Sequence, residues 1–206
     1  MPDARRRHPP PVVLASASRS RLALLQAAGV PCTVEPQDVD EPQIKAEMRE
    51  RGATVEATSR ALARAKAQAV SKLRSEVLVI GADQMLECDD EWFDKPPDRD
   101  GARENLLALK GRTHRLVTSV MVMRAGEEEW SITDQARLTM RDFSDDFLEW
   151  YLAKAGARAY ASVGGYELEG LGAQLFESVE GDFFGILGLP LLPLLAFLRS
   201  ERVLAT

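Results

Sequence analysis

Apolar and polar positions follow one another along the chain in patterns that define its expected strands and helices. Short runs of β-branched and aliphatic residues are typical of buried strands, and apolar residues three or four apart are typical of helices. Strands are expected over residues 12–14, 32–35, 77–82, 117–123 and 131–140, with a small hairpin over 85–93 that turns at Asp89 and Asp90. Helices are expected over residues 20–28, 54–73 and 99–109, from a cap at Ser144 to about Ala155, and in the apolar segment 186–198.

The order of these elements predicts an α/β fold with a mixed sheet, because strands and helices do not alternate strictly. Residues 1–11 contain Arg5–Arg7 and Pro9–Pro11 and are expected to form a flexible arm. No change of composition marks a boundary after them, so residues 12–206 are expected to form a single domain. The segment 186–198 is too short to span a bilayer, and the arm lacks the apolar stretch of a secretory signal.

The strand expected over residues 77–82 leads directly to a carboxylate. Val77 to Ile80 form an unbroken apolar run, and Gly81 and Ala82 follow before Asp83. Ligands of open α/β sheets bind outside the carboxyl ends of the strands. Asp83 therefore occupies a position typical of a catalytic carboxylate, although a turn aspartate after a core strand gives the same pattern.

A second candidate is the junction between the first strand and the first helix. Small residues separate them, and free backbone N–H groups at a helix start favour a phosphate. Ser16 and Ser18 add hydroxyl donors, and Arg21 adds a guanidinium that suits phosphate oxygens. The stretch has no P-loop pattern, and a simple serine cap followed by solvated arginines also explains it.

Lys66 interrupts the stripe that the helix 54–73 is expected to turn inward. Leu62, Lys66, Ala69 and Leu73 are spaced by four, three and four residues, which places them on one helical face. An inward ammonium needs a carboxylate or a ligand phosphate as its partner. The alternative is that the stem is buried and the amine reaches water.

Three further stretches carry weaker signals. The acidic run Asp38-Val39-Asp40-Glu41 offers the oxygen ligands that a divalent cation prefers, or is a solvated loop. Lys95 is held by Pro96 in an expected loop, where it either contacts phosphate or has no role. The glycine-rich run from Gly164 to Gly172 allows close approach to a ligand, or merely forms a turn.

Composition excludes several classes of function. Hydrophobic residues make up 45% and charged residues 28%, as in ordinary soluble globular proteins. The net charge of −6 argues against broad nucleic-acid binding but allows a small anionic ligand. Cys32 and Cys88 fit no disulfide framework or zinc spacing, which suits a reducing cytoplasm. His8 lies in the arm and leaves His114 in the body, so a histidine-based triad or histidine-rich metal site is unexpected.

Taken together and in order, these stretches resemble the Maf family of nucleoside triphosphate pyrophosphatases. The matching stretches are Leu14-Ala15-Ser16-Ala17-Ser18 with Arg21, Asp38-Val39-Asp40-Glu41, Ala65-Lys66-Ala67, Gly81-Ala82-Asp83, Lys95-Pro96, Gly111-Arg112-Thr113-His114, Glu169-Gly170-Leu171-Gly172-Ala173 and Gly188-Leu189-Pro190-Leu191. The match runs from about Val12 to Leu198.

The resemblance implies an elongated α/β fold with two lobes and a central cleft, like that of the inosine triphosphatases. It implies a cytoplasmic hydrolase that cleaves nucleoside triphosphates between the α- and β-phosphates, with Mg²⁺ or Mn²⁺ as cofactor. It implies Asp83 as the catalytic base, Glu41 and Asp83 on the metal side, and a possible homodimer. Nucleic acid and membrane are not expected partners. The implied substrate-binding residues are Ser16, Ser18, Arg21, Lys66, Lys95 and Glu169.

The chain also departs from the family pattern. Many members have Pro-Arg-Arg where this chain has Arg19-Ser20-Arg21, and Arg19 is a possible replacement for the missing arginine. Gln84 and Glu169 are more similar to the branch that acts on 7-methyl-GTP than to the branch that acts on dTTP and UTP. Two alternatives to hydrolysis of this kind stay open, namely a nucleotide-binding regulator of cell division and a phosphomonoesterase.

Overall fold

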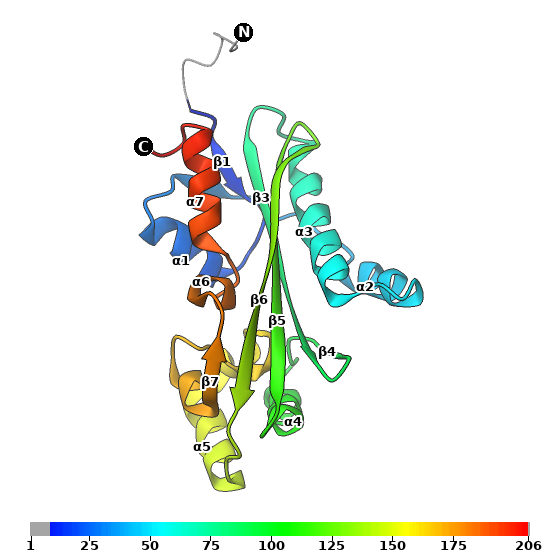
Figure 1. Ribbon diagram of the computed structural model, residues 1–206, viewed down its shortest axis with the longest axis vertical. Coiled ribbons are helices and arrows are strands. Elements are labelled where there is room, and N and C mark those ends of the chain that lie inside the picture. The colour runs from blue at the N-terminus through cyan, green and yellow to red at the C-terminus, as the bar shows by residue number, and fades with distance from the viewer. Residues whose placement is uncertain (1–8, 206) are drawn as a thin grey trace. The chain divides into compact units, whose positions relative to one another are not determined.

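The computed structural model describes residues 9–205, so most of the arm expected over residues 1–11 lies outside the described residues (Figure 1). Within the described part of the chain, no helix is long and apolar enough to cross a membrane. The chain divides into two compact units. The first unit contains residues up to Asp83, Ser119–Thr133 and residues from Gly188 onward, and the second contains Gln84–Thr118 and Asp134–Leu187. The expectation that residues 12–206 form one domain stays a prediction.

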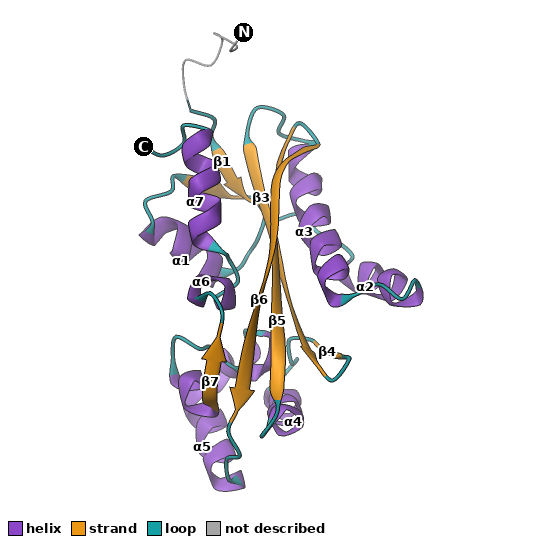
Figure 2. Ribbon diagram, viewed as in Figure 1, coloured by secondary structure: helices purple, strands orange, loops and turns teal. Residues whose placement is uncertain are grey.

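A mixed seven-stranded sheet confirms the predicted α/β class (Figure 2). Its strands are β1 (Val12–Leu14), β2 (Cys32–Val34), β3 (Leu78–Cys88), β4 (Glu91–Phe93), β5 (Thr113–Arg124), β6 (Glu127–Met140) and β7 (Phe176–Glu180). The strand order is β2-β1-β3-β5-β6-β7, and β4 pairs with β3. β1 is parallel to both of its neighbours, whereas β4 and β7 pair antiparallel with β3 and β6.

The helices of the first unit are α1 (Arg19–Ala27), α2 (Glu41–Glu50), α3 (Val55–Ser71) and α7 (Leu191–Ser200). Of these, α3 packs against β1 and β3, whereas α2 packs against α3. The small and β-branched residues of β1 and β3 pack against the inner face of α3, with Ala63, Ala67 and Val70 in the same buried cluster. On α7, Phe197 stacks on Trp130 of β6 with ring centroids 5.5 Å apart.

The second unit has an apolar core of its own. Its helices are α4 (Arg99–Leu109), α5 (Asp145–Ala155) and α6 (Phe183–Ile186), with short 3₁₀ segments η1 (Gly156–Tyr160), η2 (Val163–Gly165) and η3 (Leu171–Leu175). Leu106 and Leu109 of α4 pack in this core with Phe143 and with Tyr151 of α5. The Tyr151 hydroxyl donates a hydrogen bond to the Gly165 carbonyl, at 3.1 Å.

Side-chain caps begin α1 and α5 at the serines where the sequence predicts them. Ser18 and Ser144 each accept a hydrogen bond from the backbone N–H three residues later, as expected of N-caps. The predicted hairpin is also confirmed: β3 and β4 pair, and Asp89 and Asp90 turn between them with φ of 49° and 66°. Aspartate tolerates this left-handed conformation better than most residues.

Two predicted boundaries are wrong. The strand expected to end at Ala82 continues through Asp83 to Cys88, because the first arm of the predicted hairpin is the same strand. Asp83 therefore lies inside β3 rather than at its end. The apolar segment 186–198 is not one helix, because Gly188, with φ of 97°, and Pro190 separate α6 from α7.

A helix that the apolar pattern missed is α2. It buries no residue, so it shows no apolar stripe, and its start was interpreted as part of an acidic loop. Asp40 is the N-cap and Glu41 the first residue of α2, with Pro42 in the first turn. An acidic residue and a proline in the first turn are favourable helix starts.

Candidate active site

The close packing of α3 on β3 depends on Gly81. A Cβ atom at this position would lie 2.4 Å from the Ala63 carbonyl oxygen and 2.6 Å from the Ala67 nitrogen. Both distances are shorter than Cβ atoms keep from other heavy atoms in proteins. The backbones of strand and helix are therefore in contact here. Lys66 lies in the same turn of α3, and Asp83 follows Gly81 by two residues, so this contact brings the two side chains together.

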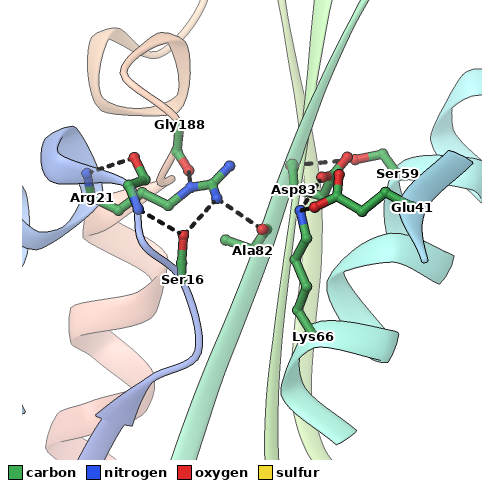
Figure 3. Close-up of polar contacts among 9 residues, drawn as sticks. Ser16, Arg21, Glu41, Ser59, Lys66, Ala82, Asp83 and Gly188 are labelled. Atoms are coloured by element: carbon green, nitrogen blue, oxygen red, sulfur yellow. Dashed lines mark hydrogen bonds and ion pairs between the residues drawn. The ribbon is translucent and has the colours of Figure 1, made fainter. Parts of the chain in front are cut away.

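The ammonium of Lys66 bridges two carboxylates (Figure 3). Its Nζ lies 2.7 Å from Asp83 Oδ1 and 2.9 Å from Glu41 Oε1. The side chains of Lys66 and Asp83 are 14% and 7% exposed, whereas that of Glu41 is 41% exposed. The inward lysine thus has the carboxylate partner that its burial requires. The stripe predicted around it is only partly correct, because Leu73 lies past the end of α3 and is 71% exposed.

One oxygen of Asp83 is left without a partner. Among the described residues, none makes a hydrogen bond to the buried Asp83 Oδ2. The Ser59 hydroxyl donates to the Asp83 backbone carbonyl, at 3.4 Å. A buried carboxylate oxygen without a donor carries an unfavourable desolvation free energy. Oδ2 is therefore the atom of this site best suited to bind a ligand water or cation.

The donor set fits a hard divalent cation in part. Glu41 and Asp83 offer carboxylate oxygens, and together they carry one negative charge more than Lys66 offsets. Within residues 9–205, no group of three or more His, Cys, Asp or Glu side chains is arranged to hold a metal ion. Such a site suits Mg²⁺, which usually takes one or two protein carboxylates and completes its coordination with water and phosphate oxygens.

Arg21 is buried beside these residues and joins three parts of the first unit. Its Nε donates to the Gly188 carbonyl, at 2.8 Å, and its Nη1 donates to the Ala82 carbonyl, at 2.8 Å, and to Ser16 Oγ, at 3.1 Å (Figure 3). Burial lowers the pKa of Arg21, and the charges of Asp83 and Glu41 oppose that effect. The guanidinium therefore stays positive next to the Asp83 backbone.

The loop before α1 is held in one shape by its serine hydroxyls. Ser18 Oγ accepts from the Arg21 N–H, and Ser16 Oγ accepts from the Ser18 N–H, at 3.2 Å, as well as from the Arg21 guanidinium. A hydroxyl has two acceptor lone pairs, and both of those on Ser16 are occupied. Its proton is therefore free to be donated to an anion.

The structure brings six of the predicted site residues into the first unit and leaves two in the second. Ser16, Ser18, Arg21, Glu41, Lys66 and Asp83 belong to the first unit. Lys95 lies between β4 and α4, and Glu169 lies in a turn between η2 and η3; both are exposed residues of the second unit.

Sequence reasoning missed three groups that shape the site. Gly81 admits α3, Gly188 supplies a carbonyl to Arg21, and Ser59 supports the Asp83 backbone. The glycine in a buried strand was the available signal for Gly81, and the polar Ser59 on the buried face of α3 was another. No local pattern indicates that the Gly188 carbonyl lies beside Arg21, because 167 residues separate them.

A buried carboxylate paired with lysine, next to a serine loop at a helix start, defines a class of α/β proteins suited to phosphorylated ligands. The family model described as "Maf-like protein" matches residues 11–201. The chain belongs to this family, which confirms the resemblance found in the sequence.

Relatives of two names lie at similar distance from this chain. It is 52% identical to a nucleoside triphosphate pyrophosphatase from Paramagnetospirillum magneticum, covering 92% of this chain and 97% of the relative. It is 48% identical to a 7-methyl-GTP pyrophosphatase from Mesorhizobium japonicum, covering 92% and 95%. A crystal structure of a nucleoside-triphosphatase / dITP/XTP pyrophosphatase from Mycobacterium abscessus is 16% identical, with a TM-score of 0.44 over 94% of this chain and 95% of that one.

Proposed function

We propose that this chain is a metal-dependent nucleoside triphosphate pyrophosphatase, which hydrolyses the α–β phosphoanhydride to give a nucleoside monophosphate and pyrophosphate. The observation that carries the proposal is the buried Asp83 carboxylate, which is paired with Lys66 through Oδ1 and keeps Oδ2 without a partner. The names of the relatives, nucleoside triphosphate pyrophosphatase and 7-methyl-GTP pyrophosphatase, support the same reaction class. Surplus or non-standard nucleotides are the proposed substrates, and the cytoplasm the proposed location, which the two free cysteines favour.

In the proposed mechanism, Asp83 is the general base. Its Oδ2 orients a water molecule and takes up the proton as that water attacks the α-phosphorus. Lys66 holds the other oxygen of the carboxylate and so fixes its orientation. Because the leaving group is pyrophosphate, no protein acid with a strongly raised pKa is required to release it.

Other residues of the first unit offset the charge of the triphosphate. The Ser16 hydroxyl, which has its proton free, and the loop around Ser18 would donate to phosphate oxygens. Glu41 and Asp83 would hold the divalent cation, which when bound offsets phosphate charge and lowers the pKa of a bound water.

Roles for Lys95 and Glu169, two residues of the second unit, are also proposed. Lys95 is proposed to contact phosphate, and Glu169 to accept hydrogen bonds from a guanine edge. An exposed carboxylate can accept from the N–H groups of guanine but cannot donate to a carbonyl, so Glu169 favours the 7-methyl-GTP alternative over dTTP and UTP. A panel of these three triphosphates with Mg²⁺, assayed for pyrophosphate, decides the base preference.

The test of the catalytic proposal is Asp83→Asn. The amide keeps the shape of the side chain but cannot take a proton, so we expect pyrophosphate release to fall by about 100- to 10,000-fold with an unchanged circular dichroism spectrum. Asp142→Asn is the matched control, because its carboxylate is 86% exposed, and it should keep normal turnover. Near-normal turnover by Asp83→Asn would show that Asp83 is not the general base.

The same assay separates the rival functions. A nucleotide-binding regulator of cell division would bind a triphosphate without releasing pyrophosphate, and a phosphomonoesterase would release orthophosphate instead. Gel filtration with light scattering of the same sample tests the proposed homodimer.

A further inference from the structure

We infer that Arg21 is a positioning residue for Asp83, an inference that rests on the proposed function. The guanidinium does not touch the Asp83 side chain. It donates to the carbonyl of Ala82, the residue directly before Asp83, and fixes the backbone from which the carboxylate projects. This role is distinct from the phosphate contact predicted for Arg21 and does not depend on it.

The Ala82 carbonyl needs a donor because β1 ends too early to supply one. β1 and β3 pair in parallel register up to Leu14 and Ile80, and the Ala15 N–H donates to the Ile80 carbonyl at 2.8 Å. In a parallel ladder, carbonyls two residues apart face the same neighbour. The Ala82 carbonyl is thus the next acceptor on that side, beyond the end of β1. Arg21 Nη1 donates to this carbonyl in place of a β1 residue, so the hydrogen bonds along this side of β3 continue to the residue before Asp83.

The other bonds of Arg21 fix the guanidinium itself. Nη1 also holds Ser16, and Nε holds the carbonyl of Gly188, which has φ of 97°. A Cβ atom at position 188 would lie 3.3 Å from Arg21 Nε, so the absence of a side chain there gives the guanidinium room. Arg21 is 8% exposed, and its three acceptors lie in the loop before α1, in β3 and between α6 and α7.

Lysine cannot reproduce this arrangement. Its charge is the same, but a single ammonium at the end of a flexible stem does not match three acceptors set around a planar fork. Arg21→Lys therefore keeps the charge near Asp83 while it releases the Ala82 carbonyl. Displacement of a catalytic group by about 1 Å can lower a rate by about 100-fold.

The first arm of the test compares Arg21→Lys with the wild type in turnover and in binding. We expect kcat to fall by about 10- to 100-fold. The Kd of a non-hydrolysable triphosphate analogue with Mg²⁺ should change by less than about threefold, because the charge is kept. Arg51→Lys is the matched control, since its side chain is 72% exposed, and should behave as the wild type. A weakened Kd with unchanged kcat, or no change in either, overturns the inference and leaves Arg21 at most a phosphate ligand.

The second arm needs no turnover. The ¹³C chemical shift of the Asp83 carboxyl carbon is recorded in the free protein at one fixed pH, where a loosened contact with Lys66 should move this signal in Arg21→Lys. Gly188→Ala, which leaves the arginine in place but crowds it, should move the signal in the same direction. If no triphosphate releases pyrophosphate even with the wild type, the proposed function fails, while this spectrum still decides the inference: identical signals in all three proteins overturn it.

Discussion

His114 is a buried histidine that links the stability of the second unit to pH. Its Nε2 shares a hydrogen bond with the Tyr166 hydroxyl, at 2.7 Å, and its ring packs against Phe176 with centroids 5.9 Å apart. Within the described part of the chain, Nδ1 has no hydrogen-bond partner. Burial lowers the pKa of His114 to about 4. The folded protein therefore holds this imidazole neutral at pH values where an exposed histidine would be charged.

We expect acid to destabilise the fold through His114. In the unfolded chain its pKa is about 6.5, so between pH 6.5 and 4 the unfolded state binds a proton that the folded state does not. The contribution to stability is complete above pH 6.5 and is lost as the pH falls towards 4, by up to about 3 kcal/mol. Urea unfolding at pH 7 and at pH 4.5 measures the loss, and His114→Gln should show a smaller difference between the two. An equal difference in both proteins would assign the acid sensitivity to other groups.

Glu41 offers a residue-scale test of the metal proposal. Glu41→Gln keeps a hydrogen-bond acceptor for Lys66 but removes one of the two carboxylate charges. We expect the Mg²⁺ concentration for half-maximal activity to rise by about tenfold or more, because fewer charged ligands weaken a divalent site. Isothermal titration with Mn²⁺ gives a second readout without turnover.

The control for this variant is Glu50→Gln, at the exposed end of the same helix. It removes the same charge from α2 but does not contact Lys66. Equal metal dependence of the two variants would exclude Glu41 as a ligand.

At the scale of elements, the contact between β3 and α3 controls both packing and the site. We expect Gly81→Ala to destabilise the protein by about 1–3 kcal/mol or more, because the new methyl group would meet helix backbone that has no rotamer to yield. It should also lower kcat, since α3 carries Lys66. Thermal unfolding measures the first effect and the pyrophosphate assay the second.

Gly170→Ala is the matched control for that variant. Its nearest neighbour would be the Glu167 carbonyl oxygen at 3.8 Å, an ordinary contact distance, and its φ of −129° suits alanine. If Gly81→Ala had the same melting temperature as this control, α3 would be able to move away from β3 without a loss of stability.

Elements with a strong apolar pattern were predictable from sequence, and α2 shows why others were not. The pattern of α3 is clear because one face of the helix is buried against β3, and the prediction of 54–73 agrees closely with Val55–Ser71. α2 has no buried face, so its start could be recognised only from the N-cap Asp40 and from Pro42 in the first turn. A helix that packs on a core has apolar residues on one face, and an exposed helix lacks this periodicity.

At the scale of the whole molecule, the sequence indicated which charged residues could act together but not how the fold assembles them. Asp83, Lys66 and Glu41 were chosen for their charges and the structure places them in contact. Their assembly depends on tertiary features, such as the approach of α3 to Gly81, that no local window contains. The chain also passes between its two units inside β3, β5 and β6, at points that no local pattern in the sequence marks.

The bond between Arg21 and the Gly188 carbonyl has a consequence for biosynthesis. The ribosome must add another 167 residues after Arg21 before this acceptor exists. Until then Arg21 lacks one of its three acceptors, so the backbone next to Asp83 cannot reach its final arrangement. Under the proposed function, we therefore expect pyrophosphate release only from chains that extend past Gly188.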